Sequence, residues 1–186
     1  MSIDDLIFID NLPKIDLHSL DREISRVLIN DFIKDNIKLK HQFIVIIHGN
    51  GSGILKRTTS EVLKQNKNVI VCAPTGIAAI NIQGVTIHRC FQVSPEPQVV
   101  KHIKKVPQVV KESDIIVIDE ISMCRIDLFD FVVRTIMKAE ENSLSRKQIV
   151  VVGDFFQLPP VTTDNDLEVL KEIYENYHKG YAFEST

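Results

Sequence analysis

Two adjacent carboxylates follow an apolar run. Asp119 and Glu120 come directly after Ile115–Ile118, in which every residue is β-branched. At the end of a buried strand, the first carboxylate is held rigidly enough to bind a Mg²⁺ ion that bridges nucleotide phosphates, and the second can orient or deprotonate an attacking water. The pair therefore indicates phosphoryl chemistry, although a strand that ends in a solvated acidic turn has the same pattern.

A second group of residues has the chemistry for acid–base catalysis on a phosphodiester. It consists of two histidines and an aspartate at the ends of two apolar runs, followed by alternating glycines. The glycines let backbone N–H groups approach a phosphate at a helix N-terminus, and the imidazoles and the carboxylate can transfer protons. A glycine turn beside two structural histidines is the alternative. The residues are Asp16, His18, His48, Gly49, Gly51 and Gly53.

Both groups depend on a parallel sheet for their position. The apolar runs are residues 15–17, 43–47, 69–73, 115–118 and 149–152. The last four are nearly continuous, which is typical of strands buried on both faces, and segments of helical period separate them. We predict an α/β fold with a three-layer, mostly parallel, doubly wound sheet that contains all five runs. Ligands bind such sheets at the carboxyl ends of the strands, where the candidate residues stand. The first predicted helix should bury the stripe Leu20, Ile24, Val27, Leu28 and Phe32.

The composition limits the function. The 186 residues fit one domain of ordinary size or two small ones, and 22 Lys+Arg against 25 Asp+Glu give a net charge of −3. Any nucleic-acid surface must therefore be a local patch. No apolar run reaches the roughly 18 residues of a membrane span, and the acidic start does not resemble a signal peptide. Cys72, Cys90 and Cys124 lack CxxC spacing, which argues against a disulfide framework or a zinc site. We expect a cytoplasmic protein.

Three further motifs follow other strand-like runs. They are APTG at 73–76, GVTIH at 84–88 and GDFFQLPP at 153–160. In this order, and together with VIDEISM at 117–123, they resemble the Pif-type DNA helicases, RecD-like members of helicase superfamily 1. The resemblance extends from about residue 67 to residue 186 and includes a Walker B pattern at Asp119 and Glu120.

This resemblance implies a RecA-like motor core that uses Mg²⁺ and ATP and acts on DNA. Asp119 would hold Mg²⁺, Glu120 would act on the hydrolytic water, and Gln157 would sense the γ-phosphate. A PTG turn at a helix start offers N–H groups to a DNA phosphate, and an imidazole offers a face for base stacking. The second motor half is absent, so strand separation by this chain alone is not expected. The residues along the single-stranded DNA track would be Pro74, Thr75, Gly76 and His88.

The segment that should contain the phosphate-binding P-loop departs from the pattern G-x-x-x-x-G-K-[ST]. Counted from Gly49, the second glycine is Ile54, the lysine is Leu55 and the hydroxyl is Lys56. Leu55 cannot bridge the β- and γ-phosphates, and Lys56 lies one position late, about 100° away around a helix. We expect millimolar or weaker binding of Mg-ATP, and weak or lost ATP hydrolysis.

The same segment resembles a second family. HGNGSGIL at 48–55, preceded by IDLH at 15–18, is similar to the HGxGxGxL and LDxH motifs of the small MutS-related (Smr) domain. The resemblance covers about residues 13–66. It implies nicking or cleavage of nucleic acid, in DNA repair and recombination or in RNA turnover. The implied site consists of Asp16, His18, His48, Gly49 and Gly51.

The sequence therefore predicts an N-terminal extension (1–12), an Smr-like segment (13–66) and a Pif-type motor segment (67–186) in one continuous α/β domain. The leading hypothesis is a relative of Pif-type helicase ATPases of the DNA repair class. An Smr-type endonuclease or nucleic-acid-binding module is the alternative, and an inactive fused remnant is the second alternative. The expected partner is single-stranded or structured DNA, or RNA, and the oligomeric state stays open.

Overall fold

One parallel sheet organises the chain. The computed structural model describes residues 12–48, 54–65, 68–97, 103–141, 147–153 and 159–174. The sheet has six strands in the order β1-β2-β6-β5-β3-β4, and every pairing is parallel. The strands are β1 (Lys14–Asp16), β2 (Phe43–Ile47), β3 (Val69–Ala73), β4 (Val85–Thr86), β5 (Ile115–Ile118) and β6 (Gln148–Gly153).

The predicted α/β fold and its single sheet are confirmed. β2 pairs with β6, which pairs with β5, which pairs with β3, so the sheet continues across residue 67. The division of the chain into an Smr-like and a Pif-type segment stays a prediction. The short edge strand β4, which comes from the GVTIH motif, was not predicted because two residues give no periodic signal.

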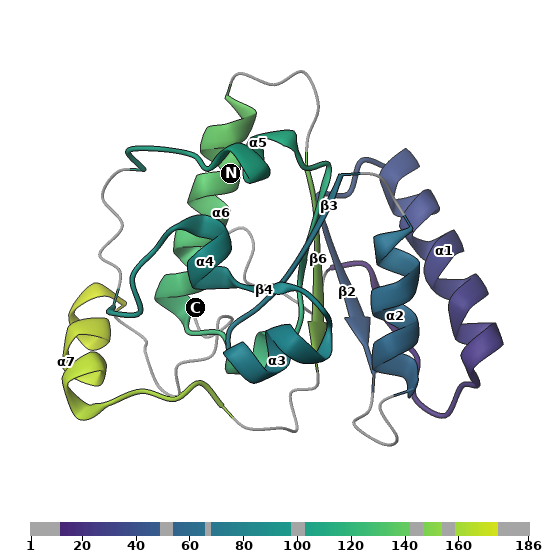
Figure 1. Ribbon diagram of the computed structural model, residues 1–186, viewed down its shortest axis with the longest axis horizontal. Helices are drawn as coiled ribbons and strands as arrows, with labels where there is room; N and C mark the ends of the chain where they lie inside the picture. Colours follow the sequence, from purple (N-terminus) through teal and green to yellow (C-terminus); the bar gives the residue numbers. More distant parts are fainter. Residues whose placement is uncertain are drawn as a thin grey trace.

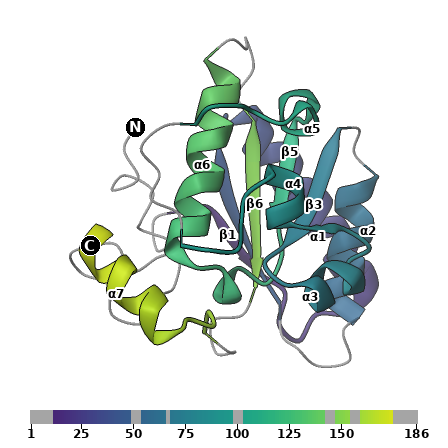
Figure 2. The ribbon, with the colours of Figure 1, turned by 60° about the vertical axis from the view of Figure 1, so that its left-hand side comes forward.

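Helices cover both faces of the sheet (Figure 1; Figure 2). Two successive residues of β2 show the two layers. Val45 belongs to one apolar cluster and Ile46 to the other, because successive side chains of a strand point to opposite faces. The first face is covered by α1 (Arg22–Lys38), α2 (Ile54–Lys64) and α3 (Gly76–Asn81). The second is covered by α4 (Ile87–Phe91), α5 (Gln108–Glu112) and α6 (Ile126–Glu140).

Helix α7 (Asp164–Ile173) lies apart from the sheet and packs on the start of α6 (Figure 2). Leu170 contacts Ile126 in a small apolar cluster, and the Tyr174 hydroxyl donates to Asp130 Oδ2 at 3.2 Å. No helix within the described ranges is both long and apolar enough to cross a membrane.

Helix α1 does not bury the predicted stripe. Ile24 and Val27 are 50% and 59% exposed, and only Leu20 and Phe32 of the stripe pack against the core, so that prediction is wrong for most of the stripe. The helix has two apolar faces, and the buried one also satisfies polar groups: Asn36 donates to the carbonyl of Phe32 at 2.7 Å and pairs with the His41 ring at 2.7 Å. The residues that face the sheet are Ser25, Ile29, Ile33 and Asn36.

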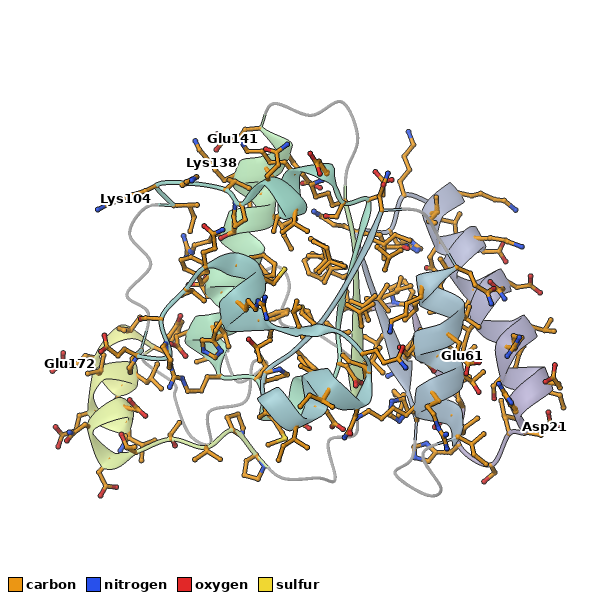
Figure 3. The ribbon with its side chains drawn as sticks, in the orientation of Figure 1. Asp21, Glu61, Lys104, Lys138, Glu141 and Glu172 are labelled. Atoms are coloured by element: carbon orange, nitrogen blue, oxygen red, sulfur yellow. The ribbon has the colours of Figure 1, made fainter. Side chains whose placement is uncertain are left out.

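Helices α1 and α2 share a surface carboxylate. Arg22 and Arg26 each donate to Glu61 Oε2 at 3.0 Å, and Glu61 lies between the two helices in Figure 3. Exposed ion pairs contribute only about 0–1 kcal/mol each. The position of α2 therefore depends mainly on its buried apolar face, where Val62 and Leu63 are almost inaccessible to solvent. This matters for the site because α2 carries Lys56.

Candidate functional site

The carboxylate pair is buried at the carboxyl end of the central strand β5. Asp119 and Glu120 are 3% and 8% exposed, so the alternative of a solvated acidic turn is wrong. The backbone N–H of Asp119 donates to the carbonyl of Cys72 at 2.9 Å, which extends the pairing of β5 with β3 by one residue. The first carboxylate is thus held rigidly, as the sequence predicts.

The second carboxylate follows a sharp turn in the backbone. Glu120 has φ 54° and ψ 46°, the left-handed conformation, and it begins the short helix η3 (Ile121–Met123). For a residue with a Cβ this conformation costs about 1–2 kcal/mol. The turn packs on the end of β6: a Cβ at Gly153 would lie 2.9 Å from Ile121 Cγ2 and 3.1 Å from its backbone nitrogen. A glycine at the end of β6 therefore leaves room for the turn that carries Glu120.

Lys56, from the first turns of α2, reaches both carboxylates. Its Nζ lies 2.6 Å from Glu120 Oε1 and 3.3 Å from Asp119 Oδ2. The three side chains are 16%, 11% and 4% exposed, respectively. Burial by itself lowers the pKa of Lys56, but the hydrogen bond that Lys56 donates to Glu120 and the charges of both carboxylates outweigh it and raise the pKa above that of an ordinary lysine. Lys56 is therefore a fixed ammonium at neutral pH.

The other side of Asp119 faces a buried histidine. His48 follows β2, is 1% exposed, and places Nε2 at 3.8 Å from Asp119 Oδ1. This is too long for a hydrogen bond. Among the described residues, neither ring nitrogen of His48 has a hydrogen-bond partner, and neither oxygen of Asp119 forms a well-aligned hydrogen bond. Polar atoms buried without a partner are costly, so this edge of the sheet has unused capacity to bind a ligand or water.

The described side chains do not fit a Mg²⁺ ion at the carboxylates. Mg²⁺ needs near-octahedral oxygen ligands at about 2.0–2.1 Å and normally keeps several waters. Here Oδ2 of Asp119 and Oε1 of Glu120 face the Lys56 ammonium, and Oδ1 of Asp119 faces His48. In the described part of the chain, no three His, Cys, Asp or Glu side chains gather to form a metal site, so a Mg²⁺ ion here would depend on the two carboxylates and on substrate phosphates.

Asp16 and His18 form a separate pair on the surface. The His18 Nδ1 lies 2.6 Å from Asp16 Oδ1, and the His18 backbone N–H donates to the same oxygen at 2.9 Å. That backbone hydrogen bond is the main reason why the pKa of Asp16 is lowered. Because β1 and β2 are parallel neighbours, His18 and His48 lie on the same edge of the sheet, as predicted. Their environments differ, since His18 is 45% exposed while His48 is buried beside Asp119.

The residues predicted to contact DNA also lie on this edge. Thr75 follows β3 and caps α3, where its hydroxyl accepts from the Ala78 N–H at 3.2 Å. A Cβ at Gly76 would meet nothing within 4 Å, so the surface above the turn is open to a ligand. His88, in α4, is half-buried, and burial followed by the charge of Arg125 lowers its pKa. It is therefore a neutral imidazole near pH 7.

Some predicted residues fall outside the described part of the chain. They are Gly49, Gly51, Gly53 and Gln157. Sequence reasoning also missed two features of the site. It treated Lys56 only as a failed phosphate ligand, although the count from Gly49 puts it at the hydroxyl position, which lies beside the metal in a P-loop. It gave no role to Gly153, because a steric requirement for glycine leaves no pattern in a single sequence.

The fold and the site together define the class of the protein. The parallel sheet with helices on both faces, and the acidic pair after the central strand, form a three-layer α/β core of the RecA-like, P-loop class. The chain belongs to the PIF1-like helicase family, because the model of that family matches residues 17–177. The match begins at residue 17, so it extends over most of the segment that resembles an Smr domain, and the Smr relationship stays a prediction.

Individual relatives agree with this membership. The ATP-dependent DNA helicase PIF1 of Emericella nidulans is 36% identical over 124 residues, which are 62% of this chain and 17% of the relative. The ATP-dependent DNA helicase Pif1 of Campylobacter jejuni is 32% identical over 152 residues, 73% of this chain and 32% of the relative. The solved structure of Bacteroides Pif1 helicase with ADP-AlF3 and single-stranded DNA matches with a TM-score of 0.68 and 31% identity, over 84% of this chain and 38% of that one. The chain thus spans well under half of each relative.

Proposed function

We propose that this chain is the first motor half of a Pif1-type protein, and that it binds single-stranded DNA but hydrolyses ATP weakly or not at all. Its relatives are named as ATP-dependent DNA helicases, and one is solved with single-stranded DNA. The observation that carries the proposal is the contact of Lys56 with Asp119 and Glu120. Its single positive charge lies against an oxygen of each of the two carboxylates on which hydrolysis would depend, and compensates one of their two negative charges.

The weak hydrolysis follows from the roles that the side chains can no longer perform. Glu120 accepts a 2.6 Å hydrogen bond from an ammonium, so its charge is already compensated and it is a poor base for an attacking water. Leu55, at the lysine position, has no charge to offer a γ-phosphate. An ATP molecule at this edge would keep only the attraction of the α2 N-terminus, about 0.3–1 kcal/mol.

Calorimetric titration of the purified chain with Mg-ATP tests this part of the proposal. We expect a dissociation constant in the millimolar range or weaker, and no phosphate release above background when single-stranded DNA is added. A micromolar dissociation constant that disappears in Asp119→Ala would contradict the proposal, because it would show that the loop binds nucleotide without its lysine.

The DNA-binding part is supported by the open edge formed by Pro74, Thr75, Gly76 and His88. Fluorescence anisotropy with a labelled single-stranded oligonucleotide and no nucleotide tests it. We expect binding at low salt, and its dependence on salt will report how many phosphates the Lys and Arg side chains of the chain neutralise, because Pro74, Thr75, Gly76 and the neutral His88 carry no charge. Absence of binding at low salt would support the inactive remnant instead.

The Asp16–His18 pair favours nucleic-acid cleavage as a second candidate function. An exposed imidazole oriented by a carboxylate 2.6 Å away has the geometry of a general acid–base pair. Nicking of supercoiled plasmid in the absence of ATP tests it, with His18→Ala and His48→Ala as the variants. Nicking activity that both variants lose would favour the hypothesis of an Smr-type nuclease. Activity that both retain would come from a contaminant.

A further inference from the structure

The ammonium of Lys56 lies where it closes off the acidic pair from one side. The three groups come from separate elements: Lys56 from α2, Asp119 from the end of β5, and Glu120 from the turn before η3. Nζ is within 3.3 Å of a carboxylate oxygen on each acid. One cation thus bridges two carboxylates in a site whose members are 4–16% exposed.

This is the contact pattern of a bridging metal ion, with a side chain in the place of the metal. A divalent cation at a carboxylate pair compensates their mutual repulsion and lies beside both. The Lys56 ammonium does the same with one positive charge, and the helix that carries it is packed on the core through Val62 and Leu63. A metal ion that approached the same oxygens would meet a like charge that already lies 2.6 Å and 3.3 Å from them.

The position of Lys56 in the sequence gives the same result independently. In the P-loop pattern counted from Gly49, Lys56 stands at the Ser/Thr position, whose hydroxyl binds Mg²⁺. A lysine there removes a metal ligand. It also extends its charge to the space that the ion would fill.

We infer that Lys56 is a built-in replacement for the divalent cation, and that it closes this site to Mg²⁺ and Mn²⁺. Any nucleotide or other polyphosphate that binds at this edge binds as the metal-free anion. The inference deepens the proposed function and depends on it only for the choice of nucleotide as ligand. The exclusion of metal is a property of Lys56, Asp119 and Glu120 alone.

Titration of the full chain with Mn²⁺ alone, followed by the electron paramagnetic resonance signal of the free ion, tests the inference without nucleotide or DNA. We expect no binding by the wild type that depends on Asp119. Lys56→Ser and Lys56→Gln should each gain one site, with affinity higher than the wild type by on the order of tenfold or more, because a nearby positive charge has been removed. Lys56→Arg keeps the charge and should gain nothing. The double variant Lys56→Ser, Asp119→Asn should lose the gained site.

Two results would overturn the inference. One is a Mn²⁺ site in the wild type that Asp119→Asn abolishes, and this measurement does not require the lysine variants to fold. The other is Lys56→Ser and Lys56→Gln variants that keep the wild-type circular dichroism spectrum and still bind no Mn²⁺. Failure of the chain to bind single-stranded DNA would refute the proposed function and leave both results unchanged.

Discussion

Removing the charge of Lys56 should destabilise the protein far more than removing the charge of a surface lysine. In Lys56→Met, the stem is kept and the ammonium is lost, so Asp119 and Glu120 stay 3% and 8% exposed with no cation beside them. Removal of one partner of a buried ion pair typically costs about 3–5 kcal/mol. We expect a value near the lower end of that range, because Lys56 itself is 16% exposed and water can partly replace it. Urea unfolding followed by circular dichroism measures the loss as a lower midpoint at unchanged slope.

Lys38→Met is the matched control for this experiment. Lys38 pairs with Asp35 at 3.4 Å, but its side chain is 76% exposed, so its loss should cost about 0–1 kcal/mol. The double variant Lys56→Met, Glu120→Gln should lose less stability than the sum of the losses in the two single variants, because it removes one of the two carboxylate charges that Lys56→Met leaves buried without a cation. If Lys56→Met is no less stable than Lys38→Met, the ion pair does not exist in solution and the reasoning about the site is wrong.

Three further variants test other parts of the structure. Gly153→Ala should lower the thermal midpoint, at a cost of about 1–3 kcal/mol, because its Cβ meets Ile121 at 2.9 Å; a wild-type midpoint would show that the turn adjusts freely. Burial raises the pKa of the Cys90 thiol to about 11. The stability contributed by the protonated thiol is therefore complete below the ordinary value of 9.0 and is lost as the pH rises through 11, which should lower the urea midpoint. This decline should be smaller in Cys90→Ala, and equal declines in the two proteins would contradict the prediction. His88→Ala should weaken binding of single-stranded DNA by about 5- to 150-fold if a base stacks on the ring, as measured by anisotropy, and an unchanged affinity would remove His88 from the DNA track.

The sheet could be predicted because its signal is strong and local. The nearly continuous apolar runs of β2, β3, β5 and β6, rich in Ile and Val, have no solvated face, and such strands are typical of a parallel sheet covered on both sides. The buried face of α1 could not be predicted, because the helix has apolar residues on two faces. Ile24 and Val27 lie on the exposed face, and Ile29 and Ile33 lie on the buried one.

The site was only partly predictable for a similar reason. Asp119 and Glu120 were found because strand and carboxylates are adjacent in the sequence. Lys56 lies 64 positions from Glu120, and the register that brings α2 to the end of β5 is a property of the packed sheet. The left-handed turn at Glu120 was equally hidden, since nothing about a glutamate indicates φ 54°.

The two departures from the P-loop pattern are linked by the geometry of the helix. Moving the lysine by one residue turns its side chain by about 100°, from the direction of the phosphates to that of the metal. A neutral residue at position 56 would leave Asp119 and Glu120 buried with nothing to compensate them in the absence of metal, at a cost of several kcal/mol. With Leu55 unable to hold a metal-bound nucleotide in place, a lysine at position 56 keeps the acidic pair stable without one. On this argument the lysine at position 56 also has a structural role. It makes the core independent of Mg-ATP, so the wild type should show the same urea midpoint with Mg-ATP as with EDTA, and Lys56→Ser should be stabilised by Mg²⁺. A wild-type midpoint that rises with Mg²⁺ would show that the ion still enters the site.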